Sequence, residues 1–355
     1  MPSPRDFAQP AARRAWIQQI LAPLDEPFWE QSARELFTWQ FTHVPVYRRL
    51  CLAHDITPQR LKSWRDIPAV PQQLFKHVNV FGHSPARPAA IYETSGTTTG
   101  QPGRQYLLQT DIYRAISVEG AHRAGLLNSA PQLHFLTPSP VEAPHSSLSA
   151  MFGFWQKATH QTGENFWARK EKFEFDSLRK TVAAQIKTRR PIAICGTAFS
   201  FVHLIDAWAD LPPLRLPRGS WILETGGFKG RSREISKAEL YAQLQRLFSV
   251  SDNSIWNEYG MSELSSQAYA RGTSGLHEVP PWARILVCDP ATGREVRIGQ
   301  RGLIRWIDLA NVDSVMALQT LDAAERTPHG FRLIGRLPRT EPRGCSLSAE
   351  DLKGQ

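Results

Sequence analysis

Between residues 90 and 257 the chain alternates short apolar runs with longer segments of helical periodicity, and this alternation most constrains the fold. The apolar runs have the length of buried strands, and the segments between them have the length of helices. Strands that alternate with helices favour an α/β fold, in which ligands bind at the carboxyl ends of strands. The expected strands are Ala90–Tyr92, Leu133–Leu136, Pro191–Gly196, Trp221–Glu224 and Ser254–Asn257.

The two ends of the chain have other patterns. From Arg13 to Cys51 apolar residues recur at helical spacing and are interrupted by prolines, which predicts several helices. A proline-punctuated connector, Ile67–Pro71, follows them. Beyond Arg284, shorter runs such as Ile285–Val287 and Leu303–Trp306 predict a β-rich subdomain.

Composition limits the partners and the compartment. The formal net charge is +9, but the charge is scattered and no recognition module is present, so we expect no nucleic-acid partner. Either an anionic nucleotide substrate or a solvated basic surface explains why the net charge is positive. The four cysteines lack disulfide or metal-ligand spacing, which suits a reducing cytoplasm. With no signal peptide and no stretch apolar enough to span a membrane, we expect a soluble, cytoplasmic protein.

A Thr/Ser/Gly loop follows the first expected strand, and a helix over Thr110–Leu127 is expected after it. Glycines let backbone N–H groups face an anion and hydroxyls add donors, which indicates phosphate binding. The loop is not a P-loop, because no Gly-Lys-Ser/Thr follows it. The other interpretation, a plain linker, does not normally lie between a strand and a helix. The candidate phosphate-binding residues are Thr94, Ser95, Gly96, Thr97, Thr98, Thr99 and Gly100.

This loop, TSGTTTGQPG, resembles the phosphate-binding signature of the acyl-adenylate-forming superfamily, which includes acyl-CoA synthetases, adenylation domains and firefly-type luciferases. The segment NEYGMSE at residues 257–263 resembles that superfamily's Tyr-Gly-x-Ser/Thr-Glu motif. The resemblance implies that Asn257, Tyr259 and Gly260 lie at the nucleotide, with Tyr259 packed on adenine. It also implies that Glu263 holds Mg²⁺ near the phosphates of ATP, as a carboxylate can. Without it, a Tyr-Gly turn with Glu263 in the first turn of a helix is the simpler interpretation.

Three further segments resemble the acyl-protein synthetase family, the acid-activating subunit of the bacterial-luminescence fatty-acid reductase. They are ETGGFKGRSRE from residue 224, EPRGCS from residue 341, and IPAVPQQLFK from residue 67, which is also similar to phenylacetate–CoA ligases. The resemblance runs from about residue 65 to the C-terminus. It implies that Gly226 and Gly227 lie along the adenine, that Asp322 holds the ribose hydroxyls, and that Arg336 is the basic residue of a hinge.

The sequence departs from the superfamily pattern in three places. The loop has one Thr more than the usual pattern, or a Thr where Gly is normal. Gly103–Arg104 stands where a Lys often follows the Pro, and the chain ends soon after Cys345. Longer members continue into a small C-terminal domain with a catalytic lysine. We therefore expect an α/β fold: the large N-terminal-type domain of the acyl-adenylate-forming fold, with mixed sheets flanked by helices, lacking most or all of that small domain. The cation would then come from Lys229, Arg231 or Arg336.

Cys345 is the candidate acyl acceptor. In the resembled family an acyl group moves from the adenylate to a protein thiol near the C-terminus, and Arg343 nearby would favour the thiolate. The alternative is an ordinary cysteine in a turn. Cys51, Cys195 and Cys288 lie in apolar runs and are expected in the core.

The resemblance implies an acid–thiol ligase that uses ATP and Mg²⁺. Its substrate would be a fatty or aryl carboxylic acid, and its acceptor a protein cysteine, with a reductase or carrier as partner. The alternatives are an acid–CoA ligase with coenzyme A as acceptor, and a non-catalytic scaffold that binds ATP or AMP. The expected organisation is a helical lead-in over 1–84, an ATP-binding α/β and β-rich core over 85–334, and a hinge-like tail over 335–355 that carries Cys345.

Overall fold

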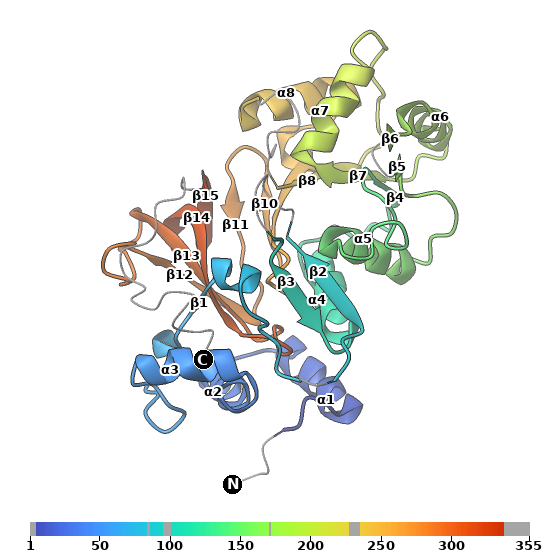
Figure 1. The fold of residues 1–355 in the computed structure, drawn as a ribbon. Coiled ribbons are helices and arrows are strands. Elements are labelled where there is room, and N and C mark those ends of the chain that lie inside the picture. The colour runs from blue at the N-terminus through green and yellow to red at the C-terminus, as the bar shows by residue number, and fades with distance from the viewer. Residues whose placement is uncertain (1–4, 84–85, 95–100, 170–171, 227–234, 337–355) are drawn as a thin grey trace. The chain divides into compact units, whose positions relative to one another are not determined.

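The computed structural model describes residues 5–83, 86–94, 101–169, 172–226 and 235–336 (Figure 1). These residues form two compact units. The first takes the described residues of Met1–Ile116, Met261–Ser266 and Glu278–Gln355, and the second takes those of Ser117–Gly260 and Gln267–His277. The expected boundaries after residues 84 and 334 stay predictions.

The second unit is built on a mostly parallel sheet with the strand order β10-β9-β8-β7-β4. Neighbours among β4, β7, β8 and β9 are parallel, and β10 is antiparallel to β9. The expected strands of this region are therefore confirmed, with β9 two residues longer than its predicted end at Asn257. The bounds are β4 (Gln132–Phe135), β7 (Ile192–Thr197), β8 (Trp221–Thr225), β9 (Ile255–Tyr259) and β10 (Ala268–Arg271).

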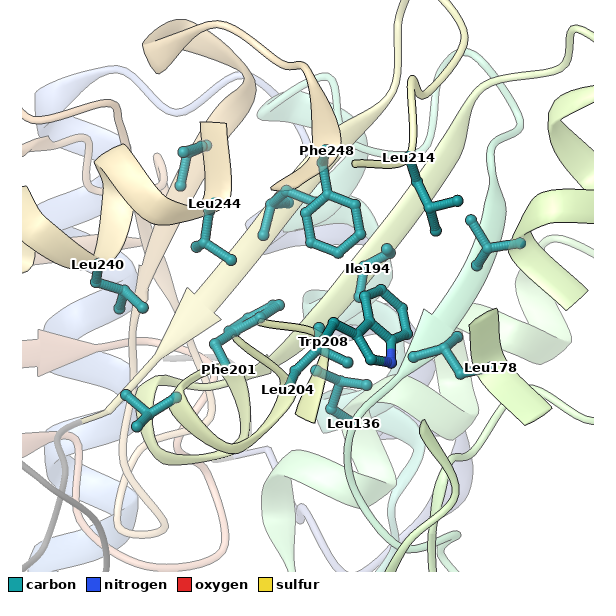
Figure 2. Close-up of a cluster of buried hydrophobic side chains, with 14 of the residues drawn as sticks. Leu136, Leu178, Ile194, Phe201, Leu204, Trp208, Leu214, Leu240, Leu244 and Phe248 are labelled. Atoms are coloured by element: carbon teal, nitrogen blue, oxygen red, sulfur yellow. The ribbon is translucent and has the colours of Figure 1, made fainter. Parts of the chain in front are cut away.

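Helices cover both faces of this sheet. On one face, Ile194 of β7 and Ile222 of β8 enter a buried cluster with Phe201, Trp208 and other side chains (Figure 2). Successive strand residues point to opposite faces, so Phe135 lies on the other face, where it stacks on Phe152 at 4.6 Å. The helices are α4 (Asp111–Arg123), α5 (Ser147–Ala158), α6 (Phe175–Ile186), α7 (Ala198–Ala207) and α8 (Lys237–Phe248). The chain passes from the first unit to the second within α4.

The predicted start of α8 is confirmed. The Ser236 side chain accepts a hydrogen bond of 3.1 Å from the backbone N–H of Glu239, which satisfies one of the free donors in the first turn. The remaining short elements of the unit are β5 (Ala168–Arg169), β6 (Lys172–Phe173), the 3-10 helix η3 (Asp252–Ser254) and β11 (Leu276–His277).

The first unit contains the expected β-rich part. Antiparallel strands follow the order β15-β14-β13-β12, and the short strand β1 lies parallel to β14. In Figure 1 the blue helices α1 to α3 lie beneath these orange and red strands. The bounds are α1 (Pro10–Leu21), α2 (Glu26–His43), α3 (Pro45–Ala53), η1 (Trp64–Asp66), β1 (Val70–Pro71), η2 (Gln72–Lys76), β12 (Ala283–Cys288), β13 (Arg301–Asp308), β14 (Ala317–Thr327) and β15 (Gly330–Arg336).

The helices of the first unit hold the connection between β13 and β14. Trp16 of α1 donates its indole N–H to the carbonyl of Leu309 at 2.8 Å. Gln40 of α2 donates to the carbonyl of Asn311 at 2.8 Å and accepts from the N–H of Met316 at 2.9 Å. Buried side chains thus satisfy the polar backbone groups of this connection.

The Thr/Ser/Gly loop joins two antiparallel strands, which corrects the expected order of strand, loop and helix. β2 (Ala90–Glu93) pairs with β3 (Arg104–Leu107), with Glu93 opposite Arg104. The sequence of β3, Arg-Gln-Tyr-Leu, has only four residues, two polar ones followed by an aromatic and an apolar one. That pattern is too short to separate a strand from the linker before α4.

Among the described residues, no helix is long and apolar enough to cross a membrane.

Candidate active site

Glu263 lies in a tight turn of the first unit and is almost fully buried, with 3% of its surface exposed. Burial raises the pKa of Glu263 to about 7. A hydrogen bond from its own backbone and the positive charges of Arg336 and Lys76 oppose this rise, and the charge of Asp322 adds to it. The carboxyl is therefore poised to lose its proton when a cation approaches.

Hydrogen bonds on each side of Glu263 fix its turn. Ser262 donates its hydroxyl to the carbonyl of Glu93 at 3.0 Å, which ties the turn to the end of β2. Asn311, from the connection between β13 and β14, donates to the carbonyl of Glu263 at 2.9 Å. Asp308 accepts from the backbone N–H of Ser266 at 2.9 Å. The turn is thus attached to the end of β2 and to the end of β13 with the connection that follows it.

Asp322 and Arg336 face each other across β14 and β15. They are direct partners in the antiparallel register, and Arg336 Nε lies 3.9 Å from Asp322 Oδ1. Asp322 is 17% exposed and Arg336 57% exposed at the side chain, so the pair lies at the surface of the sheet. Asp322, assigned to the ribose, and Arg336, assigned to the hinge, therefore lie side by side. Arg336 lowers the pKa of Glu263 and Asp322 raises it.

Thr94 closes the base of the phosphate loop. Its N–H donates to the carbonyl of Gly103 at 2.9 Å, and its hydroxyl accepts from the N–H of Gly103 at 2.8 Å. The ion pair between Glu93 and Arg104, at 2.9 Å, lies one step further along the hairpin. The backbone at both ends of the loop is therefore fixed. Ser95, Gly96, Thr97, Thr98, Thr99 and Gly100 lie outside the described residues.

In the second unit, a buried polar network joins the carboxyl ends of β8 and β9. Asn257 donates its side-chain N–H to Glu224 Oε1 at 2.7 Å, and its side-chain oxygen lies 2.7 Å from Nε2 of His277. Tyr241 donates its hydroxyl to Glu224 at 3.0 Å. Burial raises the pKa of Glu224, while Lys237, 4.0 Å away, opposes the rise. The network fixes the orientation of Asn257, the first residue of the second motif.

Tyr259 and Gly226 lie at the carboxyl ends of β9 and β8. Tyr259, the last residue of β9, is 5% exposed and its ring meets that of His277 edge-on at 6.1 Å. Gly226 follows β8 with φ of +68°, a left-handed conformation that favours glycine. The chain can therefore turn sharply as it leaves β8 toward Gly227, which lies outside the described residues.

Glu258 is a buried carboxyl that the sequence patterns did not single out. Burial raises its pKa to about 7, and a short hydrogen bond from the Thr225 hydroxyl opposes the rise. A Cβ at Gly260 would lie 2.2 Å from Glu258 Oε1, so the carboxyl occupies the space that only glycine leaves open. A larger residue at position 260 would therefore have to displace this carboxyl.

Replacing Glu258 by glutamine should stabilise the protein in a pH-dependent way. The folded-state pKa of about 7 lies above the ordinary value of 4.5, so the ionised form costs stability above pH 7 and the protonated form costs none below pH 4.5. Relative to the wild type, the free energy of unfolding of Glu258→Gln should therefore rise between pH 5 and pH 8, by at most about 3 kcal/mol. Urea unfolding at the two pH values measures this rise, with Glu239→Gln, at an exposed residue of α8, as control. A gain that does not change with pH would contradict the assigned cause.

The structure brings together two groups of the predicted residues. Glu263, Asp322, Arg336 and Thr94 belong to the first unit, and Gly226, Asn257, Tyr259 and Gly260 belong to the second. Sequence patterns missed Glu258 and Asn311 and gave no role to Glu224 or Lys76, although all but Asn311 stand inside the quoted motifs. The catalytic candidates Lys229 and Cys345, together with Arg231, lie outside the described residues.

The carboxyl of Glu263 suits a metal that needs few protein ligands. No group of three or more His, Cys, Asp or Glu side chains able to hold a metal occurs in the described part of the chain. Mg²⁺ is usually bound through one or two carboxylates together with phosphate oxygens and waters. The buried carboxyl of Glu263, flanked by positive charges that favour its ionised form, fits that role.

Comparisons with known proteins agree with the resemblance of the motifs. The sequence model of the family described as "Acyl-protein synthetase, LuxE" matches residues 25–352. The long-chain-fatty-acid–luciferin-component ligase of Aliivibrio fischeri is 21% identical over 341 residues, which are 90% of this chain and 87% of that protein.

Solved structures show the same fold. A 2-hydroxyisobutyryl-CoA ligase in complex with 2-HIB-AMP matches with a TM-score of 0.66 and 17% identity, over 88% of this chain and 68% of that one. ATP-bound MatB from Rhodopseudomonas palustris matches with a TM-score of 0.51 and 16% identity, over 72% of this chain and 49% of that one. The expected α/β fold of the adenylate-forming ligases is confirmed.

The family match covers both units, from α2 through the segment with Cys345, and the fold agrees with it. The chain therefore belongs to the acyl-protein synthetase family, and it is a ligase that activates a carboxylic acid and transfers the acyl group to a thiol.

Proposed function

We propose that the chain forms an acyl-adenylate from Mg·ATP and a long-chain fatty acid, and then transfers the acyl group to Cys345. The observation that carries the nucleotide part is the buried carboxyl of Glu263, which the charges of Lys76, Arg336 and Asp322 all influence. Such a carboxyl fits a site for a cation with its attached phosphates. The choice of acid rests on the Aliivibrio fischeri relative, whose name specifies a long-chain fatty acid.

In the first step an oxygen of the acid attacks the α-phosphorus of ATP, and the bond to pyrophosphate breaks. Glu263 would hold Mg²⁺, which neutralises charge on the phosphate oxygens when bound. Asp322 would orient the ribose through its hydroxyls, and Tyr259 with Gly226 and Gly227 would bind the adenine. Catalysis would consist mainly of positioning and of electrostatic stabilisation of the phosphate charge.

In the second step a thiolate attacks the acyl carbonyl, a thioester forms and AMP leaves. The described cysteines are poor nucleophiles, because all are buried. Burial raises the pKa of Cys51 to about 12, and it also raises the pKa of Cys195 and of Cys288. Thiols that stay protonated react slowly, which leaves Cys345 as the favoured acceptor within the chain.

Intact-protein mass spectrometry tests this function. The protein is incubated with Mg·ATP and a panel of long-chain fatty acids followed by aryl acids. We expect a hydroxylamine-sensitive acyl adduct on the wild type and on Cys288→Ala, and no adduct on Cys345→Ala, which should still release pyrophosphate and form the acyl-adenylate. An adduct that survives Cys345→Ala would contradict the assigned acceptor. AMP production without any adduct, with thioester formed only after addition of coenzyme A, would favour an acid–CoA ligase.

A further inference from the structure

The short helix η2 lies between two parts of the candidate site in the first unit. β1 pairs with β14 just before it, and Gln72 then accepts a hydrogen bond of 3.0 Å from the N–H of Leu321, next to Asp322. On the other side η2 packs against β3, where the Phe75 Cβ would lie 3.4 Å from a Cβ built on Gly103. The helix is thus attached both to the base of the phosphate-loop hairpin and to the strand that carries Asp322.

Lys76, the last residue of η2, is a half-buried cation in this position. Its charge is one of those that lower the pKa of the Glu263 carboxyl. The other described cations at these elements have acidic neighbours, since Arg104 pairs with Glu93 and Arg336 lies 3.9 Å from Asp322. Within the described part of the chain, no carboxylate oxygen lies within 4.0 Å of the Lys76 ammonium. A partly desolvated ammonium without a close partner is suited to bind an anion.

We propose that Lys76 binds the β- and γ-phosphates of ATP, and so stabilises the pyrophosphate that leaves in the adenylation step. This inference rests on the proposed function, because it assigns a residue to the triphosphate of that same site. An ammonium group on a flexible stem presents a compact charge with rotatable donors, which suits phosphate oxygens that gain charge as the bond breaks. The acyl-adenylate keeps only the α-phosphate, so Lys76 would matter in the first step and not in the second.

The test separates the two steps. Lys76→Met removes the charge and keeps an apolar stem of similar length, Lys76→Arg keeps the charge, and Lys62→Met removes an exposed lysine from the same lead-in segment. The first step is measured as acid-dependent exchange of pyrophosphate into ATP. The second is measured as acyl transfer from synthetic palmitoyl-adenylate to the protein, without ATP. Binding of Mg·ATP and of AMP is measured by calorimetry on each variant, and thermal melting checks folding.

For Lys76→Met we expect exchange to fall by about 100-fold, in the range found when one preorganised donor is removed, with weaker binding of Mg·ATP and unchanged binding of AMP. Acyl transfer from the synthetic adenylate should stay at the wild-type rate. Lys76→Arg should recover much of the exchange, and Lys62→Met should behave as the wild type. Exchange unaffected by Lys76→Met, or exchange and transfer lost together, would overturn the proposal. If the wild type shows no exchange with any acid, the proposed function fails, and the binding of Mg·ATP relative to AMP still decides the role of Lys76.

Discussion

Replacing Glu263 by glutamine should lower acid-dependent exchange of pyrophosphate into ATP by about 100- to 1,000-fold, because the variant loses the carboxylate that we assign to Mg²⁺. Glutamine has the same shape and keeps the backbone bonds that hold the turn, including the one from Asn311. Exchange should be measured across a Mg²⁺ titration, where the variant is expected to need more metal. Wild-type exchange with the wild-type dependence on Mg²⁺ would exclude Glu263 as the metal ligand.

Stability distinguishes this loss from misfolding. Because burial raises the pKa of Glu263 to about 7, the ionised carboxylate destabilises the folded protein above that pH. Glu263→Gln should therefore be more stable than the wild type at pH 8, by at most about 3 kcal/mol, and should lose this advantage toward pH 5. The exposed Glu278→Gln in the same unit is the matched control and should change neither exchange nor stability. A variant that gains stability as it loses exchange has lost a functional group and kept its fold.

The sequence predicted the parallel sheet well because its strands are buried on both faces. The runs at Pro191–Gly196 and Trp221–Glu224 are nearly continuous in apolar residues, and each is followed by a helix that begins with a capping residue, Thr197 or Ser236. The β2–β3 hairpin was missed because its second strand has only four residues and lies at a loop whose composition resembles a linker. Local periodicity cannot show that Glu93 and Arg104 are partners.

Site residues that belong to a motif could be predicted from the sequence. Contacts between residues that lie far apart in the sequence could not. Asp322 and Arg336 were assigned separately, and only the register of β14 and β15 makes them neighbours. Lys76 lies in the lead-in segment, and no local pattern gave it a role. Its helix η2 is attached beside Asp322 by a bond between Gln72 and Leu321, which are 249 residues apart. Asn311 has no sequence signature, since it acts through a single buried amide.

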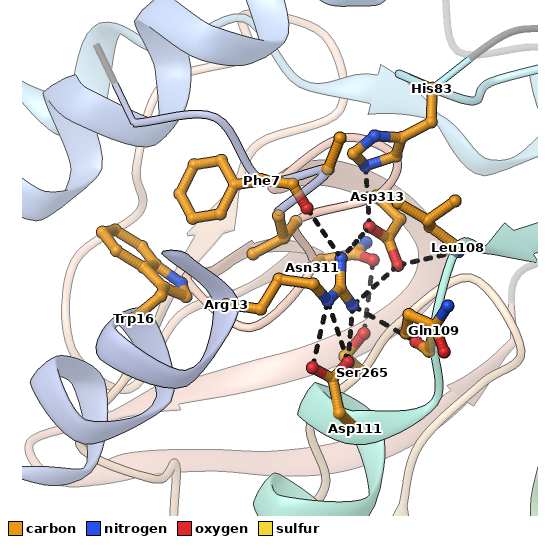
Figure 3. Close-up of polar contacts among 12 residues, drawn as sticks. Phe7, Arg13, Trp16, His83, Leu108, Gln109, Asp111, Ser265, Asn311 and Asp313 are labelled. Carbon is orange, nitrogen blue, oxygen red and sulfur yellow. Dashed lines mark hydrogen bonds and ion pairs between the residues drawn. The ribbon is translucent and has the colours of Figure 1, made fainter. Parts of the chain in front are cut away.

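The residues that lie furthest apart in the sequence meet in the ion cluster around Arg13, shown in Figure 3. The Arg13 guanidinium, 1% exposed, lies 2.6 Å from Asp313 and 2.8 Å from Asp111. Asp313 also meets His83 Nε2 at 2.9 Å and accepts from the N–H of Leu108 at 3.1 Å. Burial by itself would raise the pKa of Asp313, but His83 and Arg13 outweigh it and hold that pKa below its ordinary value. Asp313 is therefore ionised at neutral pH and needs its cation.

Replacing Arg13 by alanine should lower the free energy of unfolding by about 3–5 kcal/mol, the range for a buried ion pair that loses one partner. Arg14→Ala, the exposed neighbour on α1, is the matched control and should stay within a few tenths of a kcal/mol of the wild type. Chemical denaturation measures both. The double variant Arg13→Ala/Asp313→Ala should cost less than the sum of the single variants, because the buried carboxylate of Asp313 is then no longer left without its cation.

The cluster also bears on the site, because Asp313 lies two residues from Asn311, which holds the carbonyl of Glu263. If Arg13 acts on activity only through this connection, Arg13→Ala should lower exchange, measured at temperatures well below the melting temperature of the variant. It should leave unaffected the residues of the second unit that we assign to AMP. Binding of AMP equal to that of the wild type, together with reduced exchange, would fit that path. If Arg13→Ala is as stable as the wild type, the attachment of α1 depends on Trp16 and the apolar contacts around it. If the losses of unfolding free energy add up in the double variant, the two buried ions contribute independently.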